Sequence, residues 1–229
     1  MNINPGVIFT VAGFPVTNTL LATFLADIII IGGVIALNRA VSLRPSKLQN
    51  ILESVVDYFY KAAKDIAGDR AEYIYPWVLS FFIFIVVANV IEFIPGFESI
   101  RIGGHEGFAF LRAATSDLNL TLALATISVA VSHYYSIKYT GIKSYFHRFI
   151  SFKMFPIMLF VGFLELISEL VKFISFSFRL FGNIYAGDIL LEKTFYVVLP
   201  LELFVGLVQA LVFALLTMAF MSILTEKSH

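Results

Sequence analysis

Residues 154–191 form the stretch that decides the fold, and they read MFPIMLFVGFLELISELVKFISFSFRLFGNIYAGDILL. The stretch is apolar but carries charges inside it, and a second apolar stretch follows over 195–225. At about 1.5 Å per residue, a helix of either length exceeds the ~30 Å hydrocarbon core of a bilayer. We therefore expect a long helical hairpin that tilts, bends or lies partly along the membrane plane.

The composition requires lipid as the solvent for much of the chain. Of 229 residues, 59% are hydrophobic and 14% are charged, whereas about a quarter of an ordinary soluble domain is charged. The formal net charge is zero, so nothing indicates a nucleic-acid partner, and the lack of cysteine excludes disulfides and thiolate metal sites. No phosphate-binding loop, paired metal-ligand motif or catalytic triad is visible, so we expect no cofactor and no metal.

The rest of the chain predicts further helices within a single membrane domain, residues 1–229. The segment 46–67 has the apolar spacing of an amphipathic helix that lies on the membrane or packs on a partner, with Ser46 as its N-cap. The expected membrane spans before the hairpin are 15–37, 75–95 and 118–137. The predicted fold class is an all-α integral membrane protein with about five membrane helices and one amphipathic interfacial helix.

The basic residues are unevenly shared between the loops. Segment 38–73 carries six Lys or Arg residues and 138–153 carries four, whereas 97–117 carries two against three acids. Cytoplasmic loops are enriched in Lys and Arg. We therefore expect the N-terminus outside and both basic loops and the C-terminus in the cytoplasm.

Charged residues inside the hairpin are costly, at roughly 2.5–3.5 kcal/mol each near a helix centre. One polar stripe follows steps of three or four residues along the first helix: Glu165, Ser168, Lys172, Ser175, Arg179 and Asn183. Asp188 lies nine residues after Arg179 and so points to the opposite side. On the second helix one face carries Glu202, Gly206, Gln209, Phe213 and Thr217. Gly206 is expected to allow another backbone to approach closely.

Arg179 stays protonated and cannot relay protons by titrating. It can attract a carboxylate, keep that carboxylate ionised and repel a free proton, whereas desolvated carboxylates can titrate near working pH. Structural alternatives stay open for several other residues. Lys172 could pair with Glu165 or Glu169, Gln209 could simply join helices, and the remaining candidates for purely structural roles are Asp27, Asn89, Glu92 and His133.

Three segments resemble subunit a of F-type ATP synthases. The most specific runs from Phe176 to Asp188 and contains Arg-Leu-Phe-Gly-Asn at 179–183. The others are Asn89 with Ile-Pro-Gly at 94–96, and Thr-Ser-Asp-Leu-Asn-Leu-Thr-Leu at 115–122. The final helix, with Gln209 and Thr217, is similar too, so the resemblance covers residues from about 15 to the end.

The resemblance implies a proton-conducting stator subunit of the F0 sector, with one half-channel to a rotating c-ring and another away from it. It also implies contacts with peripheral-stalk b subunits, an indirect connection to the F1 sector, and no catalytic site of its own. Arg179 matches the family's essential arginine, and Asn183 and Gln209 match polar residues that face it. The cytoplasmic-side path matches Glu165, Ser168, Lys172 and Ser175.

Two positions depart from the family pattern. Asp188 matches the acid of the path that leads protons in, but Glu202 stands where many bacterial members have histidine. A carboxylate pair could share one proton there. Phe173 stands where many members have proline, which leaves the bend of the arginine helix open.

The resemblance favours protons over sodium as the coupling ion, and a bacterial plasma membrane as the location. A secondary transporter and an assembly scaffold are the competing functions; transporters often show repeats, and none is visible here.

Overall fold

The computed structural model describes 6–11, 13–42, 45–92, 94, 101–102, 108–142, 145, 160, 163–164, 167–168, 171, 174–175, 177–179, 181–182 and 195–226. Its long helices are α1 (Asn18–Ala40), α2 (Lys47–Ala67), α3 (Ala71–Glu92), α4 (Leu118–Thr140) and α7 (Phe195–Thr225). Four segments of this described part are long and apolar enough to cross a membrane: Asn18–Ala40, Lys47–Glu92, Leu118–Thr140 and Pro200–Thr225. The chain is therefore an all-α integral membrane protein.

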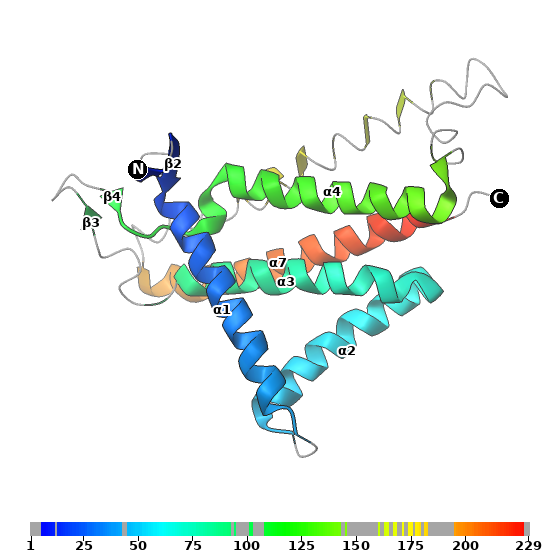
Figure 1. Cartoon of the computed structure of the whole chain (residues 1–229), viewed down its shortest axis with the longest axis horizontal. Helices are drawn as coiled ribbons and strands as arrows, with labels where there is room; N and C mark the ends of the chain where they lie inside the picture. Colours follow the sequence, from blue (N-terminus) through cyan, green and yellow to red (C-terminus); the bar gives the residue numbers. More distant parts are fainter. Residues whose placement is uncertain are drawn as a thin grey trace.

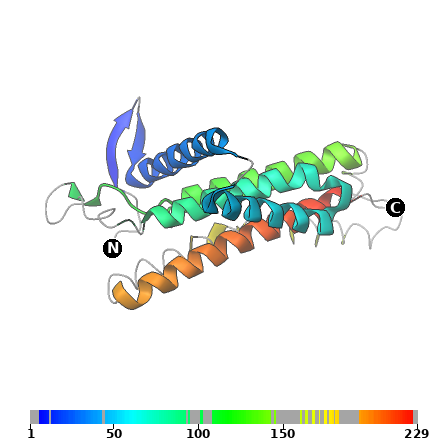
Figure 2. The ribbon, with the colours of Figure 1, turned by 90° about the horizontal axis from the view of Figure 1, so that it is seen from below.

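Helices α3, α4 and α7 form the central bundle (Figure 1). Its core contains small and flexible side chains such as Ala214, Met218 and Met221 of α7, which pack on α3. Nearer the other end, Phe81 and Phe213 meet edge to face with their ring centroids 5.6 Å apart. Figure 2 shows α7 on one side of α3 and α1 on the other.

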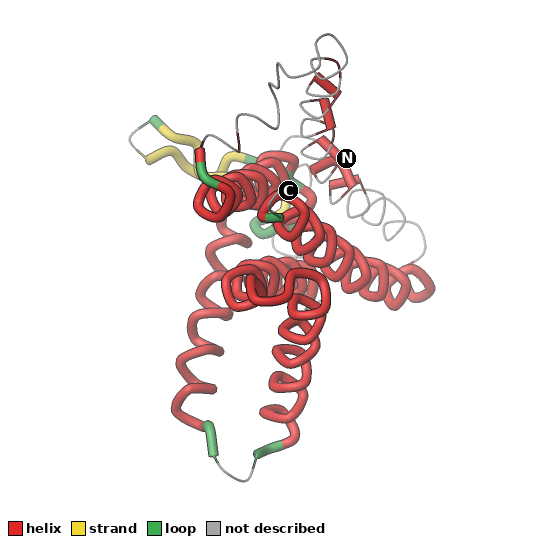
Figure 3. The backbone as a smooth tube through the Cα atoms, turned by 90° about the vertical axis from the view of Figure 1, so that its right-hand side faces the viewer, coloured by secondary structure: helices red, strands yellow, loops and turns green. Residues whose placement is uncertain are grey.

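Helix α1 crosses the bundle obliquely (Figure 1). Its first half packs through Ala22 and Ala26 against Ala88 and Ile91 of α3. Its second half exposes apolar side chains, as expected for a helix that faces lipid; Ile28 is 67% exposed and Ile31 is 59% exposed. Figure 3 shows α1 and α2 leaving the bundle on the same side.

Helix α2 has the local signals that the sequence predicts. Ser46 Oγ accepts a hydrogen bond from the Gln49 backbone N–H at 3.2 Å, and Gly68, with φ of +59°, allows the chain to turn back. After the short 3₁₀ helix η1 (Gly68–Arg70), α3 begins. The last turns of α2 pack through Phe59 and Ala63 on α3 and α7 of this same chain, whereas Leu48 near its start is 63% exposed.

Two small antiparallel hairpins were not expected. Strands β1 (Val7–Val11) and β2 (Phe14–Thr17) pair before α1, and β3 (Arg101–Ile102) and β4 (Phe108–Ala109) pair in the loop after α3. The first span therefore begins at Asn18, with Thr17 as its N-cap, rather than at residue 15. Helix α3 likewise runs over Ala71–Glu92 where 75–95 was expected, and α4 ends at Thr140 rather than 137.

Helix α7 covers the residues, 195–225, where the sequence predicts the second helix of the hairpin. The first hairpin helix, expected over 154–191, lies mostly outside the described residues. At about 1.5 Å per residue, the 31 residues of α7 span roughly 46 Å, which exceeds a ~30 Å core. Such a helix can stay within a bilayer only when it is tilted.

Candidate functional site

Five of the nine site residues that the sequence predicts lie in the described part of the chain: Ser168, Ser175, Arg179, Glu202 and Gln209. The other four, Glu165, Lys172, Asn183 and Asp188, lie outside it. Glu169, weighed as a partner of Lys172, also lies outside. The described part of the site therefore consists of Arg179 with Ser175 and of the polar face of α7.

Arg179 is partly buried, and its Nη2 donates a hydrogen bond to Ser175 Oγ at 3.2 Å. The two residues are four apart, so this contact joins consecutive turns of one helix face. Ser168, two turns before Ser175, is exposed. Ser177 is fully buried, although the sequence pattern gave it no role because it lies off the stripe.

The polar face of α7 points into the bundle. Glu202 and Gln209 are each 5% exposed, and Phe213 and Thr217 are fully buried. Thr217 Oγ1 and Ser128 Oγ of α4 are hydrogen-bonded at 3.0 Å. This face therefore packs against α3 and α4, and its two long polar side chains lie two turns apart within an apolar interior.

The Asn89 side chain of α3 joins α3 to α7 at Gly206. Its Nδ2 donates to the Gly206 carbonyl at 3.3 Å, and its Oδ1 accepts from Thr115 Oγ1 at 2.7 Å. Gly206 lies between Glu202 and Gln209, so the contact positions both side chains. A Cβ at Gly206 would lie 3.1 Å from Asn89 Nδ2 and 3.4 Å from Asn89 Cβ, so glycine at this position lets α3 and α7 pack closely.

Other polar contacts hold the two ends of the bundle. At the end near the N-terminus, Thr19 Oγ1 donates to Asp117 Oδ2 at 2.7 Å, and Asp117 also caps α4. At the opposite end, Arg70 Nη1 donates to the Ser222 carbonyl at 3.3 Å and to Thr225 Oγ1 at 3.1 Å. The described part of α7 is thus held at its middle and its end, which limits how Glu202 and Gln209 can move.

Glu202 is the acid of this face, and it is 5% exposed within the span Pro200–Thr225. Ionisable side chains within membrane helices are rare and costly, and they commonly mark ion paths. Gln209 cannot titrate, but its amide both donates and accepts hydrogen bonds. Among the described residues, no group of three His, Asp or Glu side chains is arranged to hold a metal ion.

The fold and this site define a multi-pass helical membrane protein with ionisable groups buried between its helices. The sequence profile of the ATP synthase A chain family matches residues 20–222. ATP synthase subunit a of Moorella thermoacetica is 29% identical, with 96% of each chain covered. The subunits a of Acidothermus cellulolyticus (32% identical, 91% of this chain and 76% of that one) and Bacillus subtilis (30%, 94% of each) are also similar.

This chain belongs to the ATP synthase A chain family. It is the proton-translocating stator subunit of the F0 sector in an F-type ATP synthase, with a place beside other subunits of that complex and no catalytic site of its own. It is a multi-pass protein of a bacterial membrane. The relatives thus agree with what the Arg-Leu-Phe-Gly-Asn segment implies.

Proposed function

We propose that Arg179 separates two half-channels through which protons reach and leave a rotating ring of c subunits. The observation that carries the proposal is the buried face of α7, where Glu202 and Gln209 are each 5% exposed in an otherwise apolar helix. Ionisable groups within membrane helices are expensive and mark ion paths. A fixed cation beside such a path attracts the ring carboxylate, releases its proton and blocks direct leakage.

The path that leads protons in comprises Asp188 and Glu202, and Asn183 and Gln209 are polar residues that face Arg179. Glu202 lies one turn before Gly206, at the level of Asn89 and therefore toward the end of the bundle that carries the N-terminus. That end is the one that the distribution of basic residues places outside. A proton from outside would therefore meet Glu202 before it meets Gln209.

The path that leads protons out comprises Glu165, Ser168, Lys172 and Ser175. The hydrogen bond from Arg179 to Ser175 at 3.2 Å supports this assignment, because Ser175 belongs to the path and is in direct contact with the arginine. Lys172 has a supporting role in this path, whereas Arg179 separates the two half-channels. The chain also contacts the b subunits of the peripheral stalk and, through them, is connected to the F1 sector.

Replacing Arg179 tests the proposal. ATP-driven proton pumping by inverted membrane vesicles should be abolished in the Arg179→Ala complex, because nothing then forces the ring carboxylate to release its proton. The amounts of the other subunits in the purified complex should stay normal. Lys172→Leu is the matched control, since it removes a cation from the same helix, and its pumping should fall much less.

Normal pumping by Arg179→Ala would refute the role of the arginine. Equal loss of pumping in both variants would instead show that the two cations act together. A complex that fails to assemble in either variant would favour a scaffolding role for this helix.

A further inference from the structure

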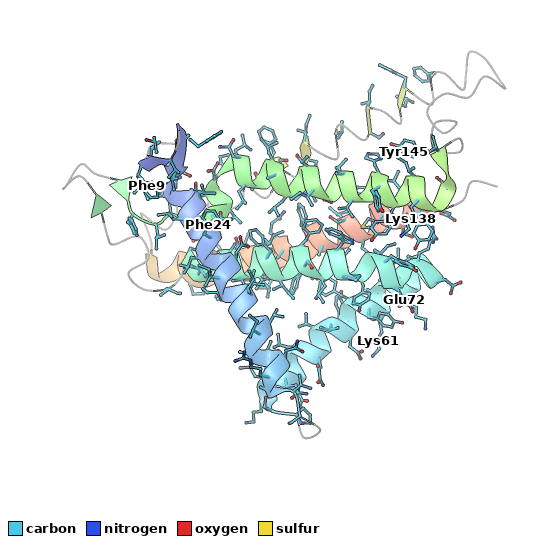
Figure 4. All side chains as sticks on the ribbon, in the orientation of Figure 1. Phe9, Phe24, Lys61, Glu72, Lys138 and Tyr145 are labelled. Carbon is cyan, nitrogen blue, oxygen red and sulfur yellow. The ribbon has the colours of Figure 1, made fainter. Side chains whose placement is uncertain are left out.

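The tyrosines of this chain gather at one end of the bundle. Eight of the ten lie within 58–75 and 134–145: Tyr58, Tyr60, Tyr73, Tyr75, Tyr134, Tyr135, Tyr139 and Tyr145. In space these segments are the end of α2, the start of α3 and the end of α4. The opposite end exposes phenylalanine instead, with Phe9 at 48% and Phe14 at 76% (Figure 4). Aromatic belts normally occur at both membrane interfaces, so the one-sided tyrosine cluster requires its own explanation.

Lys138 lies within this cluster on the last turn of α4. Its Nζ is 5.4 Å from the ring centroid of Tyr73 on α3 and 5.6 Å from that of Tyr135. Both distances are within cation–π range. The rings of Tyr135 and Tyr139 stack with centroids 6.3 Å apart, and Tyr73 meets Tyr139 at 5.7 Å. Two rings, one from α3 and one from α4, therefore lie beside one ammonium group, and Tyr139 packs against both rings.

The charge of Lys138 is not neutralised by the described part of the chain. The ion pair found there joins Lys61 to Asp57 on α2, and no described carboxylate lies within 4.0 Å of Lys138 Nζ. Lys138 itself is exposed. Aromatic rings hold a cation in place without cancelling its charge, so the ammonium remains able to bind an anion.

Tyr135 presents a second donor beside it. Trp77 Nε1 donates to Tyr135 Oη at 3.3 Å, so the tyrosine oxygen accepts within the cluster and its own O–H is available to donate outward. The ring of Tyr134, 62% exposed, lies against Tyr135. An ammonium and a hydroxyl at the edge of apolar rings suit an ester of phosphate whose hydrocarbon tail lies along the helices.

We propose that Lys138, Tyr73, Trp77, Tyr135 and Tyr139 bind the headgroup of an anionic phospholipid. The phosphate accepts hydrogen bonds from Lys138 Nζ and Tyr135 Oη, and the acyl chains lie against α3 and α4. The proposal is independent of the proton path, since none of these residues belongs to it. It explains why the tyrosines and Lys138 occupy the same end of the bundle.

Trp77 makes the site directly measurable, because it is the only tryptophan of the chain. The full-length chain is reconstituted in phosphatidylcholine vesicles that contain a small fraction of dibrominated phosphatidylglycerol or of dibrominated phosphatidylcholine. Bromine quenches tryptophan fluorescence on contact. One basic group near the surface favours an anionic lipid by about fivefold, so brominated phosphatidylglycerol should quench Trp77 at about one fifth of the concentration that phosphatidylcholine needs.

Lys138→Gln should abolish this preference, while quenching by brominated phosphatidylcholine stays unchanged and shows that Trp77 is still in the membrane. Lys64→Gln is the matched control: Lys64 is exposed on α2 near the same end, and the preference should persist. Tyr135→Phe keeps the charge and the ring and should weaken the preference in part.

Equal quenching by the two brominated lipids in the unaltered chain would overturn the proposal, as would the same loss in Lys64→Gln and Lys138→Gln, which indicates non-specific charge attraction. Added inorganic phosphate should not relieve the quenching. Relief by phosphate would show that the site binds a free anion rather than a lipid.

Discussion

Asn89 joins three segments that are far apart in the sequence, because its amide bonds both Gly206 of α7 and Thr115 before α4. A buried amide is tolerated only when its donors and acceptors are satisfied. Its neighbours Glu202 and Gln209 are buried on the same side of α7. Asn89 therefore sets where those groups lie without having to take part in proton transfer.

Because the Asn89 side chain contacts Gly206, replacing Gly206 with alanine should lower the stability of the protein. In Gly206→Ala the new Cβ would lie 3.1 Å from Asn89 Nδ2, so the amide must move and its bond to the Gly206 carbonyl is strained. We expect a loss of about 1–3 kcal/mol of stability, measured by thermal unfolding of the complex in detergent. Gly33→Ala, where nothing lies within 4 Å, is the control and should cause no loss.

Neutralising the acid of α7 should slow proton delivery without affecting assembly. Glu202→Gln keeps the size and the hydrogen-bonding capacity of this buried side chain but cannot carry the proton. ATP-driven acidification should slow by at least about tenfold, and Asp188→Asn should act likewise. If both variants pump at the normal rate across the pH range, the path that leads protons in runs elsewhere.

Arg179 and Glu202 stand out in the sequence for an energetic reason. An arginine or a glutamate within an apolar helix is conspicuous because its cost is large, so Arg179 and Glu202 can be recognised without any structure. Thr115 cannot be recognised in this way. A threonine in the short turn before α4 is not conspicuous in the sequence, and its partner Asn89 is 26 residues away across a loop.

Among the elements, α7 is the one that the others hold in place. Arg70 binds the Ser222 carbonyl and Thr225 Oγ1 near its end, and Ser222 Oγ donates to the Ile66 carbonyl of α2 at 2.9 Å. On the other side, Ser136 Oγ of α4 donates to the Leu224 carbonyl at 2.7 Å. The corner between α2 and α3 thus acts as a clamp on the last turn of α7.

Removing the Arg70 side chain should lower the stability of the protein more than removing a surface ion pair does. Arg70→Met deletes two hydrogen bonds that the charged guanidinium donates to α7 from a partly buried site, and we expect about 1.5–3 kcal/mol of lost stability. Lys61→Met is the control, since its ion pair with Asp57 is largely exposed and should contribute less than about 1 kcal/mol. Equal unfolding temperatures for the two variants would show that the Arg70 contacts do not stabilise α7.

Local rules predict where helices begin better than they predict short strands. Ser46 and Asp117 cap the next helix through their own side chains, and such contacts depend on adjacent residues only. The hairpin of β1 and β2 depends on hydrogen bonds between the two strands. Residues 7–17 show no alternation of apolar and polar side chains that would predict it. The clamp by Arg70 spans 152 residues, so no local pattern could have revealed it.

The arrangement of the whole molecule follows from packing between helices. Helix α1 crosses α3 obliquely, whereas α4 and α7 lie along it (Figures 1 and 2). Helices at such different inclinations cannot all stand along the membrane normal. The expected tilt of the second hairpin helix is consistent with this arrangement, but sequence periodicity indicates which face is buried and not which neighbour buries it.

The orientation of the whole molecule can be measured because the chain contains no cysteine. Single cysteines introduced at exposed Thr10, Ser42 and Glu226 report on β1, the tip between α1 and α2, and the end of α7. In intact cells a membrane-impermeant maleimide should label Thr10→Cys only, because the distribution of basic residues predicts that the basic loops lie in the cytoplasm. Ser42→Cys and Glu226→Cys should react once the cells are permeabilised. The opposite pattern would invert the topology and, with it, exchange the two proposed proton paths.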